Sequence, residues 1–189
     1  MSSLVLVKHS LPTVVETVPA AAWRLSPAGA ARCVRLAERL RPFDARAIAS
    51  SIEPKAVETA TLVGQELDMP IDIVEGLHEH DRRDAKLLGD SEYAAAVTSL
   101  FARPRELVFG RETAEAALAR FDAAVTGLLA RTPAVDDVIV VSHGTVISLF
   151  VAAHAGTDGL ALWKALGLPS FVVLDRADLR LERIEATIA

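Results

Sequence analysis

The amino-acid sequence predicts a three-layer α/β fold, in which a mostly parallel central sheet is flanked by helices. Two observations support this prediction. Short apolar runs of strand length alternate with segments in which apolar residues recur at helical spacing. In addition, three of the apolar runs end abruptly in polar clusters, and ligands of such folds bind outside the carboxyl ends of the parallel strands.

The expected strands are apolar runs bounded by polar or turn-forming residues. Leu4–Val7 has the continuous apolar character of a strand buried on both faces, and the β-branched run Asp137–Val141 is the clearest strand of the chain. The last two strands are joined by a turn over Asp175–Asp178. The predicted strands span residues 4–7, 47–50, 71–74, 137–141, 171–174 and 179–184.

The expected helices begin at capping signals. Ser26-Pro27 combines an N-cap residue with proline at the first helical position, and Pro54 begins a second helix in the same way. Two alanine-rich helices follow over 90–103 and 113–131, and an amphipathic helix runs through 146–153. We interpret 1–189 as a single domain, with a helical lid segment around 90–131 that covers the site.

Composition restricts the class of protein. The 189 residues carry a net charge of −5, which argues against a broad nucleic-acid or anionic-membrane surface. Cys33 is the only cysteine, and no apolar stretch reaches the length of a signal peptide core or a membrane span. These features predict a soluble cytoplasmic protein without nucleic-acid or membrane partners. They leave the oligomeric state open.

Three polar clusters are expected to meet at one edge of the sheet. They are Lys8-His9-Ser10, Ser50-Ser51 with Lys55 one turn later, and Ser142-His143-Gly144. Because the carboxyl ends of parallel strands share an edge, the two histidines are predicted to lie close together. One neutral imidazole can attack phosphorus while the other holds the phosphate oxygens. Lys8 and Lys55 can supply positive charge.

Further groups complete the expected phosphate site. Ser10 and the backbone near Thr145, at the start of a helix, are predicted to donate hydrogen bonds to phosphate. The leaving alkoxide needs a proton donor whose pKa is raised by burial or by neighbouring anions. Glu79 follows the strand over 71–74 and is our first candidate, with Asp81 as the fallback.

The sequence from Leu4 to about Ala153 resembles the histidine phosphatase superfamily, which includes the cofactor-dependent phosphoglycerate mutases. The hallmark Arg-His-Gly tripeptide of that family corresponds to Lys8-His9-Ser10, so Lys and Ser replace Arg and Gly. The second-histidine motif, Val141-Ser-His-Gly144, is the most specific match. The other matching segments are Leu25–Gly29, Ser50–Ala60 and Leu77–Glu79.

The resemblance implies a phosphoglycerate mutase-like fold and residue roles. His9 would be the phosphoryl acceptor, His143 the phosphate-clamping histidine and Glu79 the proton donor. Lys8 and Lys55 stand where the family usually has two arginines. This double exchange preserves charge but loses the planar guanidinium fork. The implied activity is a metal-independent, cofactor-free phosphomonoesterase acting on a small phosphorylated metabolite or, less favoured, a phosphoprotein.

Other interpretations remain open. A non-catalytic module that binds phosphorylated ligands and a mutase-type phosphotransferase are the main alternatives. A metal site could be formed by His78-Glu-His80-Asp81 together with His143 or His154. A serine hydrolase built on Ser142 lacks the Gly-x-Ser-x-Gly elbow. Arg82-Arg83 is interpreted as a solvated or ion-paired turn.

Overall fold

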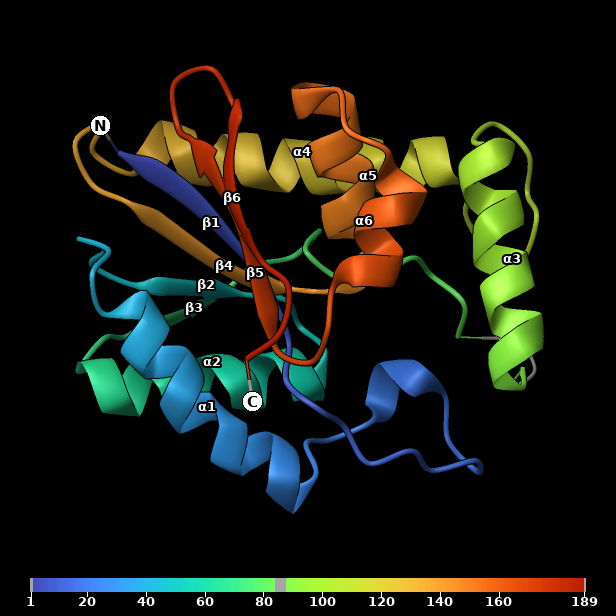
Figure 1. Ribbon diagram of the computed structural model, residues 1–189, viewed down its shortest axis with the longest axis horizontal. Coiled ribbons are helices and arrows are strands. Elements are labelled where there is room, and N and C mark those ends of the chain that lie inside the picture. Colours follow the sequence, from blue (N-terminus) through green and yellow to red (C-terminus); the bar gives the residue numbers. More distant parts are fainter. Residues whose placement is uncertain (1, 84–87, 189) are drawn as a thin grey trace.

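The computed structural model describes residues 2–83 and 88–188, and a six-stranded sheet forms its centre (Figure 1). The strand order is β3-β2-β4-β1-β5-β6. The first four of these strands are parallel, β5 pairs antiparallel with β1, and β6 pairs antiparallel with β5. The strands are β1 (Ser3–Lys8), β2 (Ile48–Ser50), β3 (Ile71–Ile73), β4 (Val138–Ser142), β5 (Ser170–Asp175) and β6 (Leu181–Glu185). The predicted mostly parallel α/β fold is therefore confirmed.

Helices cover both faces of the sheet. Two of them begin at the predicted prolines, and the Ser26 hydroxyl caps α1 by accepting a hydrogen bond from the Gly29 N–H at 2.9 Å. The helices are η1 (Ala20–Ala22), α1 (Pro27–Leu40), α2 (Pro54–Leu67), α3 (Asp90–Ala102), α4 (Ala114–Arg131), α5 (Gly144–Ala155) and α6 (Gly159–Ala165). The short elements η1 and α6 are absent from the sequence prediction.

Two apolar clusters separate the layers. On one face, α1 and α2 pack against alternate strand residues such as Val5 and Ile139. On the other face, α4, α5 and α6 pack against residues such as Leu6 and Val140. Because adjacent residues of β1 and β4 point to opposite faces, both strands are buried on both sides, as their continuous apolar sequences predict.

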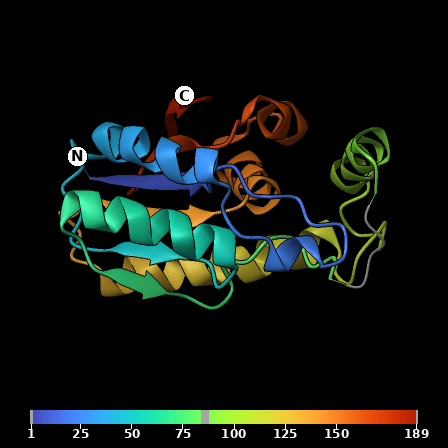
Figure 2. The ribbon, with the colours of Figure 1, turned by 90° about the horizontal axis from the view of Figure 1, so that it is seen from below.

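The segment 90–131, which we expected to act as one lid, is divided between two roles. Helix α4 belongs to the core layer, since Phe121 and Val125 are fully buried within the apolar cluster. Only α3 projects from the sheet, at the end where the loop around η1 also extends, and two views agree on this arrangement (Figures 1 and 2). The carboxyl ends of β1 and β4 point towards the same end of the molecule.

The final hairpin differs from its prediction at several boundaries, since β5 spans Ser170–Asp175 and β6 ends at Glu185. β6 begins at Leu181 rather than at 179, because Leu179 adopts a left-handed conformation with φ of 57° and extends the turn. The Asp175 carboxylate accepts a hydrogen bond from the Ala177 N–H at 2.8 Å and stabilises this turn. None of the helices in the described ranges is both long enough and apolar enough to span a membrane.

Candidate active site

The parallel pairing of β1 and β4 brings the two predicted histidines together. Lys8 and Ser142 are register partners, so His9 and His143 follow the two strands at the same level. The His9 N–H donates to the Ser142 carbonyl at 3.0 Å. The two imidazole centroids lie 5.1 Å apart, with the rings at 61° to one another. Two rings far apart in the sequence therefore share one buried site.

The hydrogen bonding of His9 determines its tautomer. His9 Nδ1 lies 2.7 Å from the Ser10 carbonyl oxygen, which can only accept a hydrogen bond. Nδ1 therefore carries the proton, and in the neutral ring Nε2 has the free lone pair. Burial, followed by the proximity of His143 and Lys55, lowers the pKa of His9 well below its usual value. The imidazole is consequently neutral at physiological pH.

His143 is fully buried, and only one of its two ring nitrogens has a hydrogen-bond partner among the described residues. Its Nε2 lies 2.8 Å from the Ser51 hydroxyl and 3.7 Å from a Glu53 carboxylate oxygen. Its Nδ1 has no hydrogen-bond partner among the described residues, which is costly for a buried polar atom. Burial and then Lys55 lower the pKa of His143 well below its usual value. A neutral ring with one unsatisfied nitrogen is suited to contact a ligand.

The Lys8 ammonium lies beside the start of α5. Its Nζ donates to the Leu166 carbonyl at 2.7 Å. A Cβ at Gly144 would lie 3.1 Å from Lys8 Cε, so the glycine leaves room for the lysine side chain to pass. Burial lowers the pKa of Lys8, and the opposing attraction of Glu79 is weaker. The ammonium is thus close enough to the site to interact with both Glu79 and His9.

Lys55 occupies the first turn of α2 and is almost entirely buried. Its ammonium donates to the Ala20 carbonyl at 2.8 Å and forms a buried ion pair with Glu53. The same carboxylate accepts a hydrogen bond from the Glu79 N–H at 2.9 Å. Glu53 therefore reduces the positive charge near Lys55 and was not anticipated from the sequence. Its position in the sequence, two residues before Lys55, could have indicated that the two side chains pair.

Ser10 and Thr145 already make contacts within the protein. The Ser10 hydroxyl donates to the Gly29 carbonyl at 2.7 Å, and the Ser10 N–H donates to the Thr59 hydroxyl at 3.0 Å. The Thr145 N–H donates to a Glu79 carboxylate oxygen at 3.1 Å. These contacts join the site to α1, α2 and the Glu79 segment.

Glu79 lies at the amino-terminal end of α5. Its carboxylate accepts hydrogen bonds from the N–H groups of Thr145 at 3.1 Å and Val146 at 3.3 Å, which lack partners within the helix. It also accepts from the His80 N–H at 2.8 Å. The structure thus places Glu79 beside the His143 end of β4, on the predicted edge of the sheet.

The pKa of Glu79 departs from the sequence expectation. Burial by itself raises it, but His143 and Arg82 favour the carboxylate. The N–H groups of His80 and Thr145 act in the same direction, and the net effect lowers the pKa. The expectation of a carboxyl group kept protonated by burial is therefore not met in the unliganded site, because the combined effects of His143, Arg82 and the backbone donors outweigh desolvation.

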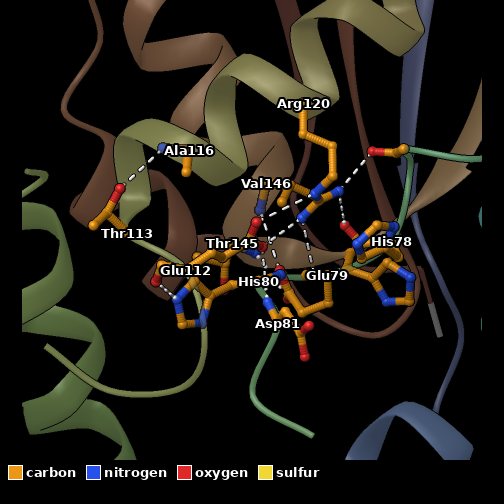
Figure 3. Close-up of polar contacts among 12 residues, drawn as sticks. His78, Glu79, His80, Asp81, Glu112, Thr113, Ala116, Arg120, Thr145 and Val146 are labelled. Atoms are coloured by element: carbon orange, nitrogen blue, oxygen red, sulfur yellow. Dashed lines mark hydrogen bonds and ion pairs between the residues drawn. The ribbon is translucent and has the colours of Figure 1, made fainter. Parts of the chain in front are cut away.

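Arg120 of α4 holds the segment that carries Glu79. Its guanidinium donates to the backbone carbonyls of Gly76 at 2.6 Å, His78 at 2.9 Å and Glu79 at 3.2 Å. Figure 3 shows the Arg120 side chain directed towards His78 and Glu79. The same guanidinium pairs with Glu112 at 2.6 Å. Glu112 in turn accepts a hydrogen bond from the Asp81 N–H at 2.8 Å. One arginine and one glutamate thus fix a loop that has no regular secondary structure.

The remaining chemical candidates do not join the histidine pair. Hydrogen bonds from Arg83 are the main cause that lowers the pKa of Asp81 to about 2, so the fallback acid is ionised. His80 Nε2 lies 2.8 Å from the Glu112 carbonyl, and His154 pairs with Asp122 at 2.7 Å. Within residues 2–83 and 88–188, no group of three or more His, Cys, Asp or Glu side chains could hold a metal ion.

Two adjoining cavities open next to the site. A cavity of about 290 Å³ is lined by residues that include Lys55, Glu79 and Arg82. Arg82 also lines the neighbouring cavity of about 800 Å³, whose walls include Trp23 and Phe109. Arg82, which we expected to lie in a solvated or ion-paired turn, instead lies at the boundary of both cavities.

Solved structures with the same fold provide the first comparison. A mycobacterial glucosyl-3-phosphoglycerate phosphatase has a TM-score of 0.78 at 21% identity, over 100% of this chain and 99% of that one. The protein YhfR of Bacillus stearothermophilus has a TM-score of 0.79 at 22% identity, over 100% and 98%. A phosphoserine phosphatase from Entamoeba histolytica has a TM-score of 0.75 at 16% identity, over 98% of each chain.

The family comparison is consistent with the fold. A search of curated proteins gives no match. The family model described as histidine phosphatase superfamily, branch 1, matches residues 18–182, a range that begins after Lys8-His9-Ser10 and includes Val141-Ser-His-Gly144. On this match over most of the chain, the protein belongs to the histidine phosphatase superfamily.

Proposed function

We propose that this protein is a phosphomonoesterase that forms a phosphohistidine on His9 and transfers the phosphoryl group to water. The observation that carries the proposal is the arrangement of the two rings. The Ser10 carbonyl holds the His9 proton on Nδ1, and His143 lies 5.1 Å away with an unsatisfied Nδ1. In this proposal His9 Nε2 is the nucleophile, and His143 Nδ1, which has no partner among the described residues, binds the phosphate.

The proposed reaction has two steps. In the first, the His9 Nε2 lone pair attacks phosphorus, the bond from phosphorus to the ester oxygen breaks, and protonated Glu79 gives its proton to the leaving oxygen. In the second, a water oxygen attacks phosphorus while Glu79 accepts a proton, and the phosphorus–nitrogen bond breaks. Phosphate leaves, and His9 returns to its neutral form with the Nδ1 proton in place.

The binding of substrate accounts for the protonation of Glu79. In the unliganded site the pKa of this carboxyl group is lowered. A phosphate ester brings negative charge next to the carboxylate and raises its pKa, so substrate and proton bind together. Lys8 and Lys55 hold the phosphate charge, and the Thr145 hydroxyl, which has no partner among the described residues, contributes a further donor. Both donors of Ser10 contact Gly29 and Thr59, so Ser10 supports the site rather than the phosphate. The reaction requires no metal ion or organic cofactor.

The proposed substrate is a small phosphorylated metabolite. The 290 Å³ cavity beside Glu79 and Lys55 has room for a phosphoryl group, and the adjoining 800 Å³ cavity has room for a leaving group. The similarity to a glucosyl-3-phosphoglycerate phosphatase and to a phosphoserine phosphatase supports this class of substrate. We favour transfer to water over a mutase reaction because two of the similar structures are named as phosphatases and match this chain along nearly its whole length.

A direct test uses p-nitrophenyl phosphate in the presence of EDTA. The expected result is turnover by the wild-type protein, loss of turnover in His9→Ala, and an acid-labile phosphoenzyme detected only when His9 is present. His154→Ala is the matched control, because this histidine pairs with Asp122 on the surface of α4 and α5. Its activity is expected to equal that of the wild type.

The alternatives give different results. Phosphate binding without turnover by the wild type across pH 5 to 8, the range chosen for this assay, would support a non-catalytic binding protein. Turnover that EDTA abolishes would support metal-dependent chemistry. Turnover that persists in His9→Ala would overturn the proposed nucleophile.

A further inference from the structure

The two lysines of the site do not provide a planar pair of donors. Lys8 donates to the Leu166 carbonyl, and Lys55 donates to the Ala20 carbonyl and pairs with Glu53. An ammonium group is a point charge, whereas a guanidinium can contact two phosphate oxygens at once. A site that must orient three equatorial oxygens during transfer therefore benefits from a guanidinium from another position.

Arg82 presents such a guanidinium to the same cavity. It follows Glu79 by three positions and lines the cavity that also contains Lys55 and Glu79. Its guanidinium carbon lies 4.4 Å from the centre of the Tyr93 ring, and one of its nitrogens donates to the Tyr93 hydroxyl. This stacking fixes the plane of the group and leaves other N–H donors available.

The charge of Arg82 is not neutralised by a direct ion pair. Across residues 2–83 and 88–188 no carboxylate lies within ion-pair distance of its guanidinium. The carboxylates of Glu79 and Glu53 attract the guanidinium only from beyond ion-pair distance, so an anionic ligand would supply the direct pairing that this partly buried group lacks. Arg82 also acts on the reacting groups, because its charge lowers the pKa values of both Glu79 and His143.

We propose that Arg82 is a phosphate-binding catalytic residue that donates two N–H groups to the non-bridging oxygens of the phosphoryl group. It would restore the bidentate contact that the exchange of arginine for lysine at positions 8 and 55 removes. This inference rests on the phosphomonoesterase function proposed above, since the phosphoryl group it binds is the one transferred to His9.

The main test compares Arg82→Met and Arg82→Lys with the control Arg103→Met. Arg103 is exposed and pairs with Glu106 at 3.0 Å, far along the chain from the proposed site. Inorganic phosphate and orthovanadate are titrated calorimetrically, and kcat/KM is measured with p-nitrophenyl phosphate. We expect affinity and kcat/KM to fall about 30-fold or more in Arg82→Met and about 10-fold in Arg82→Lys, since the lysine retains charge without the fork. The control should match the wild type.

Two further measurements separate phosphate binding from a structural role. Tyr93→Phe retains the stacking ring and removes only the hydroxyl that Arg82 contacts, so its loss should be far smaller than that of Arg82→Met. Removing the Arg82 charge should also raise the pKa of Glu79 and move the descending limb of the kcat/KM profile to higher pH. Added guanidinium should partly restore phosphate binding and activity in Arg82→Ala.

The outcomes distinguish this inference from the proposed function. Wild-type affinity for phosphate and vanadate in Arg82→Met would overturn the role of Arg82, whatever the activity. An equal loss in Tyr93→Phe, or a change in KM alone with unchanged phosphate affinity, would assign Arg82 to structure or to the leaving group and also overturn it. Phosphate binding that depends on Arg82 in a protein without His9-dependent turnover would support the site and reject the phosphatase reaction.

Discussion

The histidine pair and the proposed proton donor, Glu79, are held in place in different ways. His9 and His143 follow buried strands, and the ladder between β1 and β4 sets their spacing through backbone hydrogen bonds. Glu79 lies on an irregular loop whose position depends on the side chains of Arg120 and Glu112. The strand positions are therefore tolerant of distant side-chain changes, whereas the position of Glu79 is sensitive to them.

The largest effect is expected at a strand-held histidine. His143→Asn removes the ring whose Nδ1 is unsatisfied in the unliganded site and should lower kcat/KM about 10³-fold, as for the loss of one oxyanion donor. Because the sheet holds the backbone, the free energy of unfolding should change by no more than about 1 kcal/mol. Urea denaturation checks the second statement. A loss of stability several times larger would show that His143 is a structural residue.

The same two rings predict how stability depends on pH. Both have folded-state pKa values well below the usual value, so the unfolded chain binds more protons as the pH falls below about 6.5. Stability should therefore be highest at neutral pH and fall by about 2 to 3 kcal/mol between about pH 7.5 and 5.5. Urea denaturation at the two pH values measures this difference. A double variant, His9→Asn with His143→Asn, should lose most of it, and an unchanged difference would refute the assignment.

Substitution of Arg120, which lies outside the proposed site, should impair proton transfer by Glu79. Arg120→Met removes the donor to three loop carbonyls and should lower kcat about 30-fold, because a shift of Glu79 of the order of 1 Å impairs proton transfer. Stability should fall by about 2 kcal/mol, since Glu112 and the carbonyls lose their partner. Phosphate affinity should change little.

The control for Arg120 lies on the same helix. Arg131→Met removes an exposed ion pair to Asp72 and should leave kcat and stability close to wild type. Stopped-flow or steady-state kinetics and urea denaturation serve both variants. If Arg120→Met weakens phosphate binding as strongly as it lowers kcat, the loop also contributes to phosphate binding, and the prediction is contradicted.

The smallest predicted effect concerns the charge beside Lys55. Glu53→Gln removes a buried negative charge while keeping an oxygen that can accept the Glu79 N–H, so phosphate should bind about 5-fold more tightly. Calorimetric titration of inorganic phosphate measures the change. Glu66→Gln, on the exposed side of α2, is the control. Weaker binding in Glu53→Gln would show that the carboxylate is needed to orient Lys55.

Local sequence patterns were sufficient for the framework of the molecule. The apolar runs ending at Lys8 and Ser142 correctly located β1 and β4, because strands buried on both faces require continuous apolar residues. Ser26-Pro27 and Pro54 correctly located the starts of α1 and α2. The convergence of His9 and His143 followed from parallel pairing alone, and the measured ring separation agrees with it.

Local sequence patterns did not predict the features that depend on contacts between residues far apart in the chain. The segment 90–131 has one composition, yet α4 lies within the core layer with Phe121 fully buried, whereas α3 projects beyond the sheet and adds Leu100, near its carboxyl end, to the same apolar cluster. The direction of the pKa shift of Glu79 depends on backbone donors at the start of α5, 66 positions later in the chain at Thr145. Sequence spacing carries no information about such a contact.

The sequence by itself determined the α/β framework, the sheet edge at which His9 and His143 meet, and the presence of two lysines, Lys8 and Lys55, near that edge. Only the tertiary structure decided the electrostatic balance of the site, through the pairing of Lys55 with Glu53 and the placement of Arg82 against Tyr93. The physical reason is one of range. Periodicity and capping act over a few residues, whereas the charge that a bound phosphate experiences is the sum of groups that only folding brings together.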